Sequence, residues 1–582
     1  MGSAKPSKMM VNLLINLSSN CYKIMRIKIR VRFFLVAILA AGMFLIPDIA
    51  VSQDHQEWTY NLGMYEVNIR QFTPEGTFAA FEEHLDRLDE LGVGILWLMP
   101  IHPIGEENRL GSLGSYYSVK DYMDVNPEFG TKEDLQSLID EIHSRGMYVL
   151  LDWVPNHTSW DNVLTESNPE WYVRENGEFI IPPGTNWSDV IQLDHSQQGL
   201  LDYMIDAMLY WVEDFNVDGF RYDAPSHVLE QSFLEDLNSA LKEAKPDIFL
   251  LAEDNQAKWH DLGFDQTFGW GIYGFGHGLL TQIVDGTRSA SDFNNHMRTE
   301  YEIFGHDAYR LYFTSNHDEN SWEGTTTDIF GDAAEVFKVL TATFNGMPLI
   351  YSGQEAGLDQ QLAFFDKDEI NWGDFDHENA EIYSTLLHLK RENQALWNGA
   401  NGGPFEFVTT GNDDVLAFVR QKNDDKVFAV MNLSDQEHSV TFSEPSSFID
   451  SYTEVFTEET MTIDEETSIT LAGWDYVVFE TDAAMTGMLD EEEIPKNVYL
   501  SQNYPNPFNP ATSIKYEIPE ATHVQLKIFD ITGRSVTVLH DGTAAAGSHT
   551  IHFDASDLSS GIYFYQLQSD DFIQTKKMTL IK

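Results

Sequence analysis

The sequence has 582 residues, 42% hydrophobic and 13% aromatic, which is enough apolar side chain for packed cores and too long for a single one. Its 35 Lys and Arg against 93 Asp and Glu give a formal net charge of −58, which disfavours binding to nucleic-acid phosphates or to anionic membranes. The sequence contains one cysteine, Cys21, which excludes intrachain disulfides and paired-cysteine zinc sites.

The N-terminal segment has the pattern of a secretory signal peptide. Residues 1–32 contain basic side chains and no acid, a 14-residue apolar run follows from Phe33 to Ile46, and a small-x-small sequence ends at residue 52. We interpret the stretch before Met25 as an overlong start. Because the apolar run is short for a membrane span, we expect residues 1–52 to be removed on export, which leaves no stable span in the mature chain. An uncleaved anchor is the alternative.

From about residue 57 to 395, short apolar strands alternate with amphipathic helices. The candidate strands are Glu66–Phe72, Ile95–Pro100, Tyr148–Asn156, Gly219–Ala224, Phe249–Asp254, Tyr312–Asp318 and Leu349–Glu355. One intervening helix is indicated by a stripe at Leu135, Leu138 and Ile142, with Thr131 and Asp134 as a near capping box before it. Repeated β–α units predict a parallel sheet, open or closed into a barrel, and both forms place chemistry at the C-terminal ends of the strands.

The remaining segments divide the chain into parts. Residues 158–198 are rich in Trp, Pro, Asn and Gly without a clear period, and we interpret them as a subdomain inserted after the third strand of a catalytic part at 53–400. Short alternating strands predict a β-sandwich at 401–482. An acidic linker at 483–495 then leads to a last all-β unit at 496–582.

Polar residues gather at four strand ends. The clusters are Asp152-Trp-Val-Pro-Asn156-His157, then Gly219-Phe-Arg221-Tyr-Asp223 followed by His227, then Glu253-Asp254, and finally His317-Asp318. A single acid at such a place is usually a loop cap or the partner of an Arg. Four clusters would meet in one mouth, where converging carboxylates repel one another, and packing does not explain that arrangement. Carboxylates with an Arg and two His suit glycoside cleavage, in which one attacks the anomeric carbon and another protonates the leaving oxygen.

These clusters, in this order, resemble the four signature regions of the α-amylase family of glycoside hydrolases (family 13 type), over about residues 65–355. The segment Tyr117-Ser-Val-Lys-Asp121-Tyr122 is similar to a further Tyr-x-x-x-Asp-Tyr motif of that family. The resemblance implies an α/β fold: a (β/α)8 TIM barrel with a small inserted domain B, a C-terminal β-sandwich domain C and a further all-β domain.

Carried over by position, the resemblance implies that Asp223 is the nucleophile and forms a covalent glycosyl-enzyme. Glu253 would be the general acid and base, and Asp318 a third carboxylate that holds ring hydroxyls. Asp152 would be a supporting barrel residue rather than a catalyst. Arg221 lies two residues before Asp223, so both side chains occupy one strand face and the guanidinium can keep the carboxylate ionised.

The resemblance also implies substrate contacts. His157 and His317 would bind hydroxyls of the cleaved sugar, Tyr117 would stack under it, and Arg221 would orient the nucleophile. The alternative for the two histidines is that they are hydrogen-bonded core residues. An organic cofactor is not expected.

A structural calcium ion is a weaker expectation. Asn156 and the carbonyl of His227 fall where the family often binds calcium, but the third ligand position holds Gln192 instead of Asp, although Asp194 lies close by. A hard cation of this kind takes six to eight oxygen ligands, and the sequence offers few.

The C-terminal unit has a resemblance of its own. Asn503-Tyr-Pro-Asn-Pro-Phe-Asn-Pro510, the turn Asp530-Ile-Thr-Gly533, Ser560-Gly-Ile-Tyr563 and the terminal Lys576-Lys-Met are similar to a type IX secretion sorting domain. This implies export and sorting machinery as partners, and a secreted or outer-surface location in a bacterium with an outer membrane. The alternative is a plain accessory β-sandwich that binds carbohydrate.

The sequence therefore predicts an exported retaining hydrolase of α-1,4-glucosidic bonds in starch or maltodextrins. A glucanotransferase or an exo-acting α-glucosidase would use the same residues. A surface glycan-binding protein on an inactive barrel is the non-enzyme alternative, and the intact carboxylates Asp223, Glu253 and Asp318 speak against it. The excess of acidic residues suggests adaptation to high salt.

Overall fold

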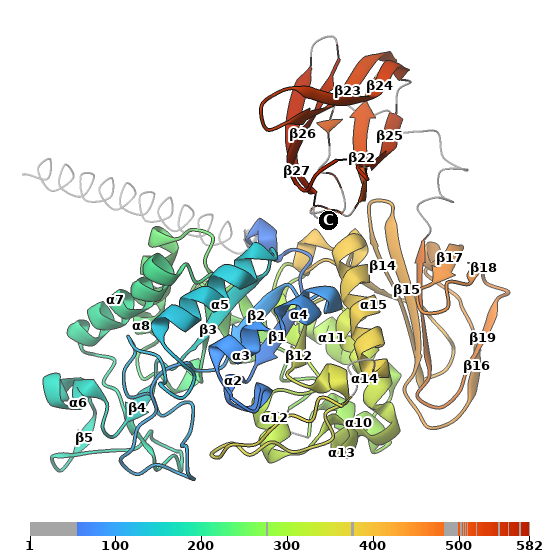
Figure 1. Cartoon of the computed structure of the whole chain (residues 1–582). Helices are drawn as coiled ribbons and strands as arrows, with labels where there is room; N and C mark the ends of the chain where they lie inside the picture. The colour runs from blue at the N-terminus through green and yellow to red at the C-terminus, as the bar shows by residue number, and fades with distance from the viewer. Residues whose placement is uncertain are drawn as a thin grey trace, which may run out of the picture. The chain divides into compact units, whose positions relative to one another are not determined.

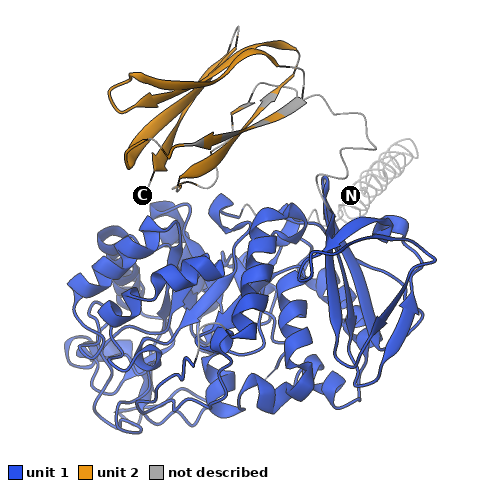
Figure 2. Cartoon of the chain, turned by 45° about the vertical axis from the view of Figure 1, so that its right-hand side comes forward, with its two compact units in different colours: residues 1–481 blue, residues 482–582 orange. Residues whose placement is uncertain are grey.

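The structure is a computed structural model of the whole chain (Figure 1). It describes residues 55–274, 277–373 and 377–481, and in the C-terminal part 499–500, 503, 506, 508, 510–519, 521–544, 547–556, 558–569, 572–580 and 582. The predicted signal segment and acidic linker lie outside these residues. The chain divides into two compact units, residues 1–481 and 482–582 (Figure 2).

A closed barrel of eight parallel strands forms the centre of the first unit, in the order β1-β12-β11-β10-β9-β8-β3-β2. The strands are β1 (Met64–Val67), β2 (Ile95–Leu98), β3 (Tyr148–Trp153), β8 (Gly219–Tyr222), β9 (Phe249–Ala252), β10 (Gln266–Phe268), β11 (Tyr309–Tyr312) and β12 (Met347–Tyr351). Nearly every residue in them is buried, as expected of strands that have side chains inside the barrel and helices outside it. The predicted TIM barrel is confirmed.

Helices follow the strands and surround the barrel (Figure 1). They are α2 (Ile69–Phe72), α3 (Phe78–Glu82), α4 (Leu85–Leu91), α5 (Lys132–Ser144), α6 (Val163–Ser167), α7 (Gln198–Phe215), α8 (Gln231–Ala244), α9 (Lys258–Asp261), α10 (Leu279–Val284), α11 (Ala290–Phe304), α12 (His317–Trp322), α13 (Thr326–Phe330), α14 (Ala334–Thr343) and α15 (Glu378–Glu392). The predicted capping box begins α5: Asp134 N–H donates to Thr131 Oγ1 (3.2 Å), and Thr131 N–H donates to Asp134 Oδ2 (2.8 Å).

Several predicted strands are wrong in part, and one strand was not predicted. The first strand ends at Val67, and the remainder of the predicted run forms α2. The predicted strand Tyr312–Asp318 covers only the end of β11, because the side chain of Asn316 accepts a hydrogen bond from Glu319 N–H (2.8 Å) and starts α12. Strand β10 has three residues, two of them polar, and so carries no periodic signal.

Domain B and domain C complete the first unit. Domain B contains the antiparallel pair β4 (His157–Ser159) and β7 (Val190–Gln192) and the pair β5 (Arg174–Glu175) and β6 (Glu178–Phe179). Domain C has the strands β13 (Phe405–Phe407), β14 (Val415–Lys422), β15 (Asp425–Asn432), β16 (His438–Thr441), β17 (Asp450–Glu454), β18 (Thr460–Ile463), β19 (Ser468–Leu471) and β20 (Tyr476–Thr481). Six of them form the sheet β13-β14-β15-β20-β17-β18, and β16 pairs with β19. The expected C-terminal β domain is present.

Two buried cations lie where domain C meets the barrel. Arg420 on β14 donates to the main-chain oxygens of Phe344 and Trp397 (both 2.7 Å). Lys390 on α15 donates to the main-chain oxygen of Leu396 (2.7 Å). Burial lowers the pKa of Lys390 well below its usual value and lowers the pKa of Arg420 to about 10. Main-chain carbonyls rather than carboxylates therefore accept from these two buried basic side chains.

The second unit is all β. It contains a sheet of β21 (Tyr499–Leu500), β22 (Ala511–Ile518) and β25 (Gly547–Asp554), and a sheet of β24 (Ser535–Ala544), β23 (Thr522–Asp530), β26 (Gly561–Gln568) and β27 (Ile573–Leu580). The alternating residues Val524, Leu526 and Ile528 are buried, as predicted. Tyr565 is also buried and accepts a hydrogen bond from Asn503 N–H (2.7 Å), so it serves the core rather than a sugar-binding face.

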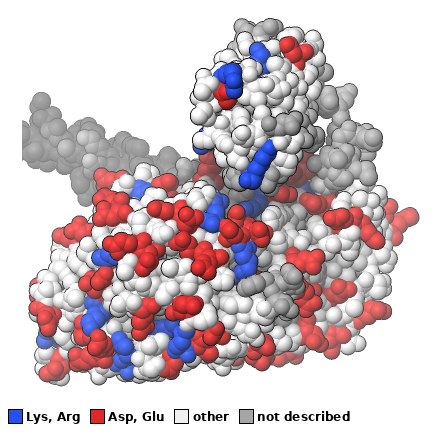
Figure 3. Space-filling model, viewed as in Figure 1, with Lys and Arg blue, Asp and Glu red and all other residues white. Residues whose placement is uncertain are grey.

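The surface reflects the composition. In Figure 3 acidic side chains are dispersed over the visible face of the first unit, with few basic ones between them. Within the described part of the chain, no helix has both the length and the apolar character needed to cross a membrane.

Candidate active site

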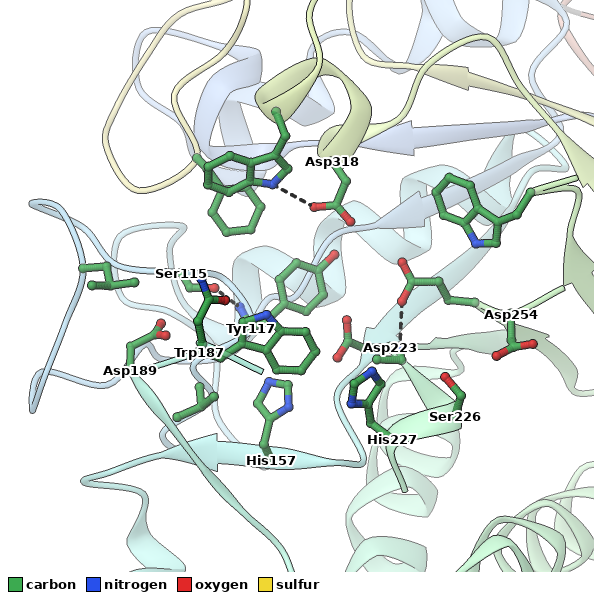
Figure 4. A pocket seen from close by; sticks show the side chains of 18 of the residues that line it. Ser115, Tyr117, His157, Trp187, Asp189, Asp223, Ser226, His227, Asp254 and Asp318 are labelled. Carbon is green, nitrogen blue, oxygen red and sulfur yellow. Dashed lines mark hydrogen bonds between the residues drawn. The ribbon is translucent and has the colours of Figure 1, made fainter. Parts of the chain in front are cut away.

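A cavity of about 880 Å³ opens at the C-terminal ends of the barrel strands (Figure 4). Its lining includes Asp223, directly after β8, Glu253, directly after β9, and Asp318 in the first turn of α12. Tyr117 and His157 line the same space. The convergence expected from the sequence is therefore present, and it follows from the common direction of parallel barrel strands.

Arg221 on β8 connects the carboxylates from beneath. Its side chain is fully buried, and Nη1 lies 2.8 Å from Asp152 Oδ1 and 3.3 Å from Asp223 Oδ1, while Nη2 lies 2.5 Å from Glu253 Oε1. The backbone N–H of Ala224 donates to Glu253 Oε2 (2.8 Å). Asp152 points to the guanidinium and stays out of the cavity lining, as expected of a supporting residue.

Three carboxylates share the single guanidinium, so their protonation is perturbed. Burial raises the pKa of Asp152 to about 6, and Arg221 limits the rise. Burial likewise raises the pKa of Asp223 and of Glu253, and the neighbouring negative charges raise them further while Arg221 opposes the change. A buried acid with a raised pKa keeps its proton to higher pH than an exposed one, which is what proton donation to a glycosidic oxygen needs.

Glu66 on β1 is a site residue that the sequence analysis did not single out. It is fully buried, and its Oε1 lies 2.5 Å from His317 Nδ1. The hydroxyl of Tyr117 donates to Asp152 Oδ2 (3.0 Å), so its oxygen is left to accept from His317 Nε2–H (2.8 Å). Both ring nitrogens then carry protons. The sequence feature that could have indicated Glu66 is that it is the one acidic residue in the otherwise apolar strand β1.

The charge on His317 follows from its surroundings. Burial alone would lower its pKa, but Asp318 and Glu66 together raise the pKa of His317 to about 9. His317 is therefore a cation at neutral pH, with its Nε2 3.5 Å from Asp318 Oδ2. This places a fixed positive charge beside the third carboxylate, at the wall of the cavity that Asp318 lines.

His157 has the opposite protonation state. Burial lowers the pKa of His157 to about 3, so the ring is neutral. Its Nδ1 lies 3.2 Å from Asn156 Nδ2, an amide nitrogen that can only donate, and the ring proton therefore sits on Nε2. One histidine of the site is thus a neutral donor, whereas His317 is a cation.

Aromatic side chains form the walls of the cavity. Trp187 from domain B lies between His157 and His227, with ring centroids 5.3 and 5.2 Å away. Trp322 donates its indole N–H to Asp318 Oδ1 (3.3 Å), and its ring lies 5.2 Å from that of Phe364. Flat aromatic faces suit the apolar faces of sugar rings. Trp187 belongs to the Trp-rich insertion at 158–198, and no role was predicted from the sequence for Trp187 or Trp322.

One of the positions expected to bind calcium, Asn156, does not fit the ion. Asn156 Oδ1 accepts a hydrogen bond from the side-chain nitrogen of Gln192 (3.0 Å), so a donor faces the oxygen that would ligate the metal. Across the described residues, no group of three or more His, Cys, Asp or Glu side chains is arranged to hold a metal ion.

Comparison with known proteins supports the reading of both units. Residues 48–467 match the α-amylase catalytic domain, and residues 502–582 match the secretion system C-terminal sorting domain. The α-amylase 2 of Dictyoglomus thermophilum is 24% identical in an alignment of 386 residues that covers 62% of this chain and 65% of that protein. The maltogenic α-amylase of Bacillus acidopullulyticus is 27% identical over 392 residues, 63% of each chain. The match thus spans slightly less than two thirds of these relatives.

Solved structures resemble the first unit over nearly their whole length. The noncanonic maltogenic α-amylase AmyB from Thermotoga neapolitana superposes with a TM-score of 0.65 at 26% identity, covering 72% of this chain and 98% of that one. An α-amylase from Lactobacillus plantarum gives a TM-score of 0.63 at 28% identity, covering 72% and 99%. Since the catalytic-domain match spans more than half of the sequence and the structure carries the corresponding barrel and carboxylates, the chain belongs to the α-amylase family.

Proposed function

We propose that the protein is a secreted retaining glycosidase that hydrolyses α-1,4-glucosidic bonds of starch or maltodextrins. The observation that carries the proposal is the arrangement of Asp223 and Glu253 on one buried guanidinium, that of Arg221, at the floor of an aromatic-walled cavity. A nucleophile and a protonated acid must lie on either side of one bond, and a common cation holds them there.

In the proposed first step, an ionised oxygen of Asp223 attacks the anomeric carbon while the protonated carboxyl of Glu253 gives its proton to the glycosidic oxygen. The bond from the anomeric carbon to that oxygen breaks, the shortened glucan leaves as an alcohol, and a glycosyl ester on Asp223 remains. In the second step Glu253 takes a proton from water, the water oxygen replaces Asp223 at the anomeric carbon, and the α configuration is restored.

The other residues bind and orient. Arg221 aims the Asp223 oxygen and favours its ionised form, because its Nη1 lies 3.3 Å away. Asp318 accepts from ring hydroxyls of the cleaved sugar and His157 supplies an N–H, whereas both N–H groups of the cationic His317 are bound to Glu66 and Tyr117, so His317 positions Tyr117 rather than binding the sugar itself. Tyr117 stacks beneath the ring. These interactions strengthen as the ring flattens toward the oxocarbenium-like transition state.

The substrate class rests on the relatives. Proteins similar to this chain carry the names α-amylase, maltogenic α-amylase and cyclomaltodextrinase, all of which act on α-linked glucans. The Trp and Phe side chains of the cavity suit a chain of glucose units, which offers a stacking face at each residue.

The location rests on the C-terminal unit. Its match to a secretion system sorting domain supports export across an outer membrane to the cell surface or the medium. Sorting machinery and an α-glucan are then the partners of the protein, and its dispersed negative charge does not favour nucleic acid as a third.

Proton NMR of residues 53–582 with maltoheptaose tests the activity. We expect short maltodextrins that appear first as the α-anomer, and no products with Asp223→Asn. Initial β-anomer would contradict the covalent step, and chains longer than the substrate would replace hydrolysis by glucan transfer. A wild-type protein without turnover would overturn the substrate assignment.

A further inference from the structure

The end of β3 and strand β7 of domain B are joined by a buried amide that faces three oxygen atoms. The side-chain nitrogen of Gln192 donates to the main-chain oxygen of Asn156 (2.9 Å), to Asn156 Oδ1 (3.0 Å) and to the main-chain oxygen of Leu193 (3.0 Å). Neither Gln192 nor Asn156 is exposed. We propose that this nitrogen takes the place of a structural calcium ion, so that domain B is fixed to the barrel without a metal.

The backbone determines which way the amide points. Two of the three partners are main-chain carbonyl oxygens, which can only accept, so Gln192 must turn its NH₂ group toward them. Asn156 Oδ1 faces the same group, and its own Nδ2 is therefore turned to His157 Nδ1, 3.2 Å away. The Gln192 amide thus acts through Asn156 on the ring that lines the cavity, and Gln192 is a positioning residue.

The same atoms do not suit a cation. Calcium takes six to eight oxygens at about 2.3–2.6 Å, whereas the three distances here are those of N–H···O hydrogen bonds. A neutral amide also brings no charge to balance a dication. The nearby carboxylate of Asp194 is engaged elsewhere: it accepts from Ser196 Oγ (2.6 Å) and from Gln197 Nε2 (2.8 Å) at the start of α7.

The Gln192 amide also connects two segments that are distant in sequence, residues 156–157 and residues 192–193. Gln192 pairs with His157 across β4 and β7, and Leu193 N–H donates to the same Asn156 oxygen (3.2 Å). The two N–H groups of the Gln192 side chain therefore bridge three oxygen atoms that a metal ion would otherwise bridge. The contact between domain B and the barrel then does not depend on the calcium concentration outside the cell.

The experiment is thermal unfolding of residues 53–582 in EDTA and in millimolar CaCl₂, together with calcium titration calorimetry. We expect the wild type to unfold at the same temperature in both. Gln192→Glu keeps the shape of the side chain, but it removes both N–H donors and sets a carboxylate against the three oxygens. This variant should lose stability in EDTA, recover it in CaCl₂, and bind calcium at least tenfold more tightly than the wild type.

Two further variants make the test specific. Gln192→Met removes the same hydrogen bonds without adding charge, so it should be less stable than the wild type and indifferent to calcium. Gln421→Glu makes the same charge change at an exposed site on β14 and should behave as the wild type. A calcium-dependent rise in the unfolding temperature of the wild type that Asn156→Ala removes would overturn the proposal. A folded Gln192→Glu variant that ignores calcium would do the same. If Gln192→Glu does not fold, the wild type and Gln192→Met decide.

Discussion

The contact between Glu66 and His317 allows a prediction whose size can be worked out. Glu66→Gln keeps the volume and the acceptor at Oε1 but removes the negative charge 2.5 Å from Nδ1. The pKa of His317 is raised from 6.5 to about 9, which at about 1.4 kcal/mol per unit corresponds to roughly 3 kcal/mol of folding free energy. Asp318 raises this pKa through its charge and Glu66 through both its charge and its hydrogen bond, so we take about 1 kcal/mol as the order of magnitude of the Glu66 share.

The sign of the pH dependence follows from the raised value. The stabilisation is fully present below pH 6.5, where the ring is protonated in folded and unfolded chains, and it is lost as the pH rises through about 9. The variant should therefore be less stable than the wild type at pH 6.5, and the difference should shrink at pH 9.5. Any pH-independent cost of burying the Gln amide is the same at both values.

Differential scanning calorimetry at the two pH values is the measurement. With an unfolding entropy of about 2.1 cal/mol/K per residue, 1 kcal/mol shifts the unfolding temperature of a unit of roughly 400 residues by about 1 °C. Glu335→Gln is a matched control, because Glu335 accepts a hydrogen bond from Tyr476 far from the cavity (2.9 Å) and contacts no histidine. A difference between Glu66→Gln and the wild type that stays constant or grows toward pH 9.5 would refute the reasoning.

Further predictions concern the carboxylates, the cavity wall and the barrel. Asp223→Asn should lower kcat by at least about a thousandfold on maltoheptaose without lowering the unfolding temperature; near wild-type turnover contradicts its role. Glu253→Gln should raise the unfolding temperature at pH 8 more than at pH 5, because the raised pKa of the buried acid removes stability as the pH rises; equal shifts in calorimetry argue against it. Trp187→Ala should raise KM by about 2- to 10-fold with little change in kcat, and a pure kcat effect would exclude stacking. Gly219→Ala should reduce the yield of folded protein, because its Cβ would lie 2.1 Å from the main-chain oxygen of Phe249; a soluble variant of unchanged stability refutes this.

The sequence predicted the structure well where a pattern is repeated along the chain, and poorly where a feature depends on a single residue or a very short strand. Apolar runs separated by amphipathic helices predicted a parallel sheet, and the family resemblance closed it into a barrel. The polar residues at the strand ends predicted the cavity, since parallel strands bring these ends together. Strand β10 escaped notice because three residues have no period. Glu66 was overlooked because its meaning comes from His317, 251 residues away in the sequence.

The sequence comparison with the family also had a limit. It found Gln192 in place of an acid, but it could not show that the amide nitrogen reaches three oxygens, two of them on the backbone. Backbone acceptors leave no trace in side-chain patterns, so contacts of this kind become visible only in three dimensions.

The buried basic side chains between the barrel and domain C affect the stability of the protein at high salt concentration and after deletion of domain C. An exposed pair such as Arg288 and Asp292 (3.1 Å) weakens when dissolved ions screen it, whereas Arg420 and Lys390 are sealed from solvent and bound to peptide oxygens. These buried contacts are therefore insensitive to ionic strength. They also tie domain C to the barrel, because deletion of domain C would expose the buried peptide carbonyls and the Lys390 side chain to water.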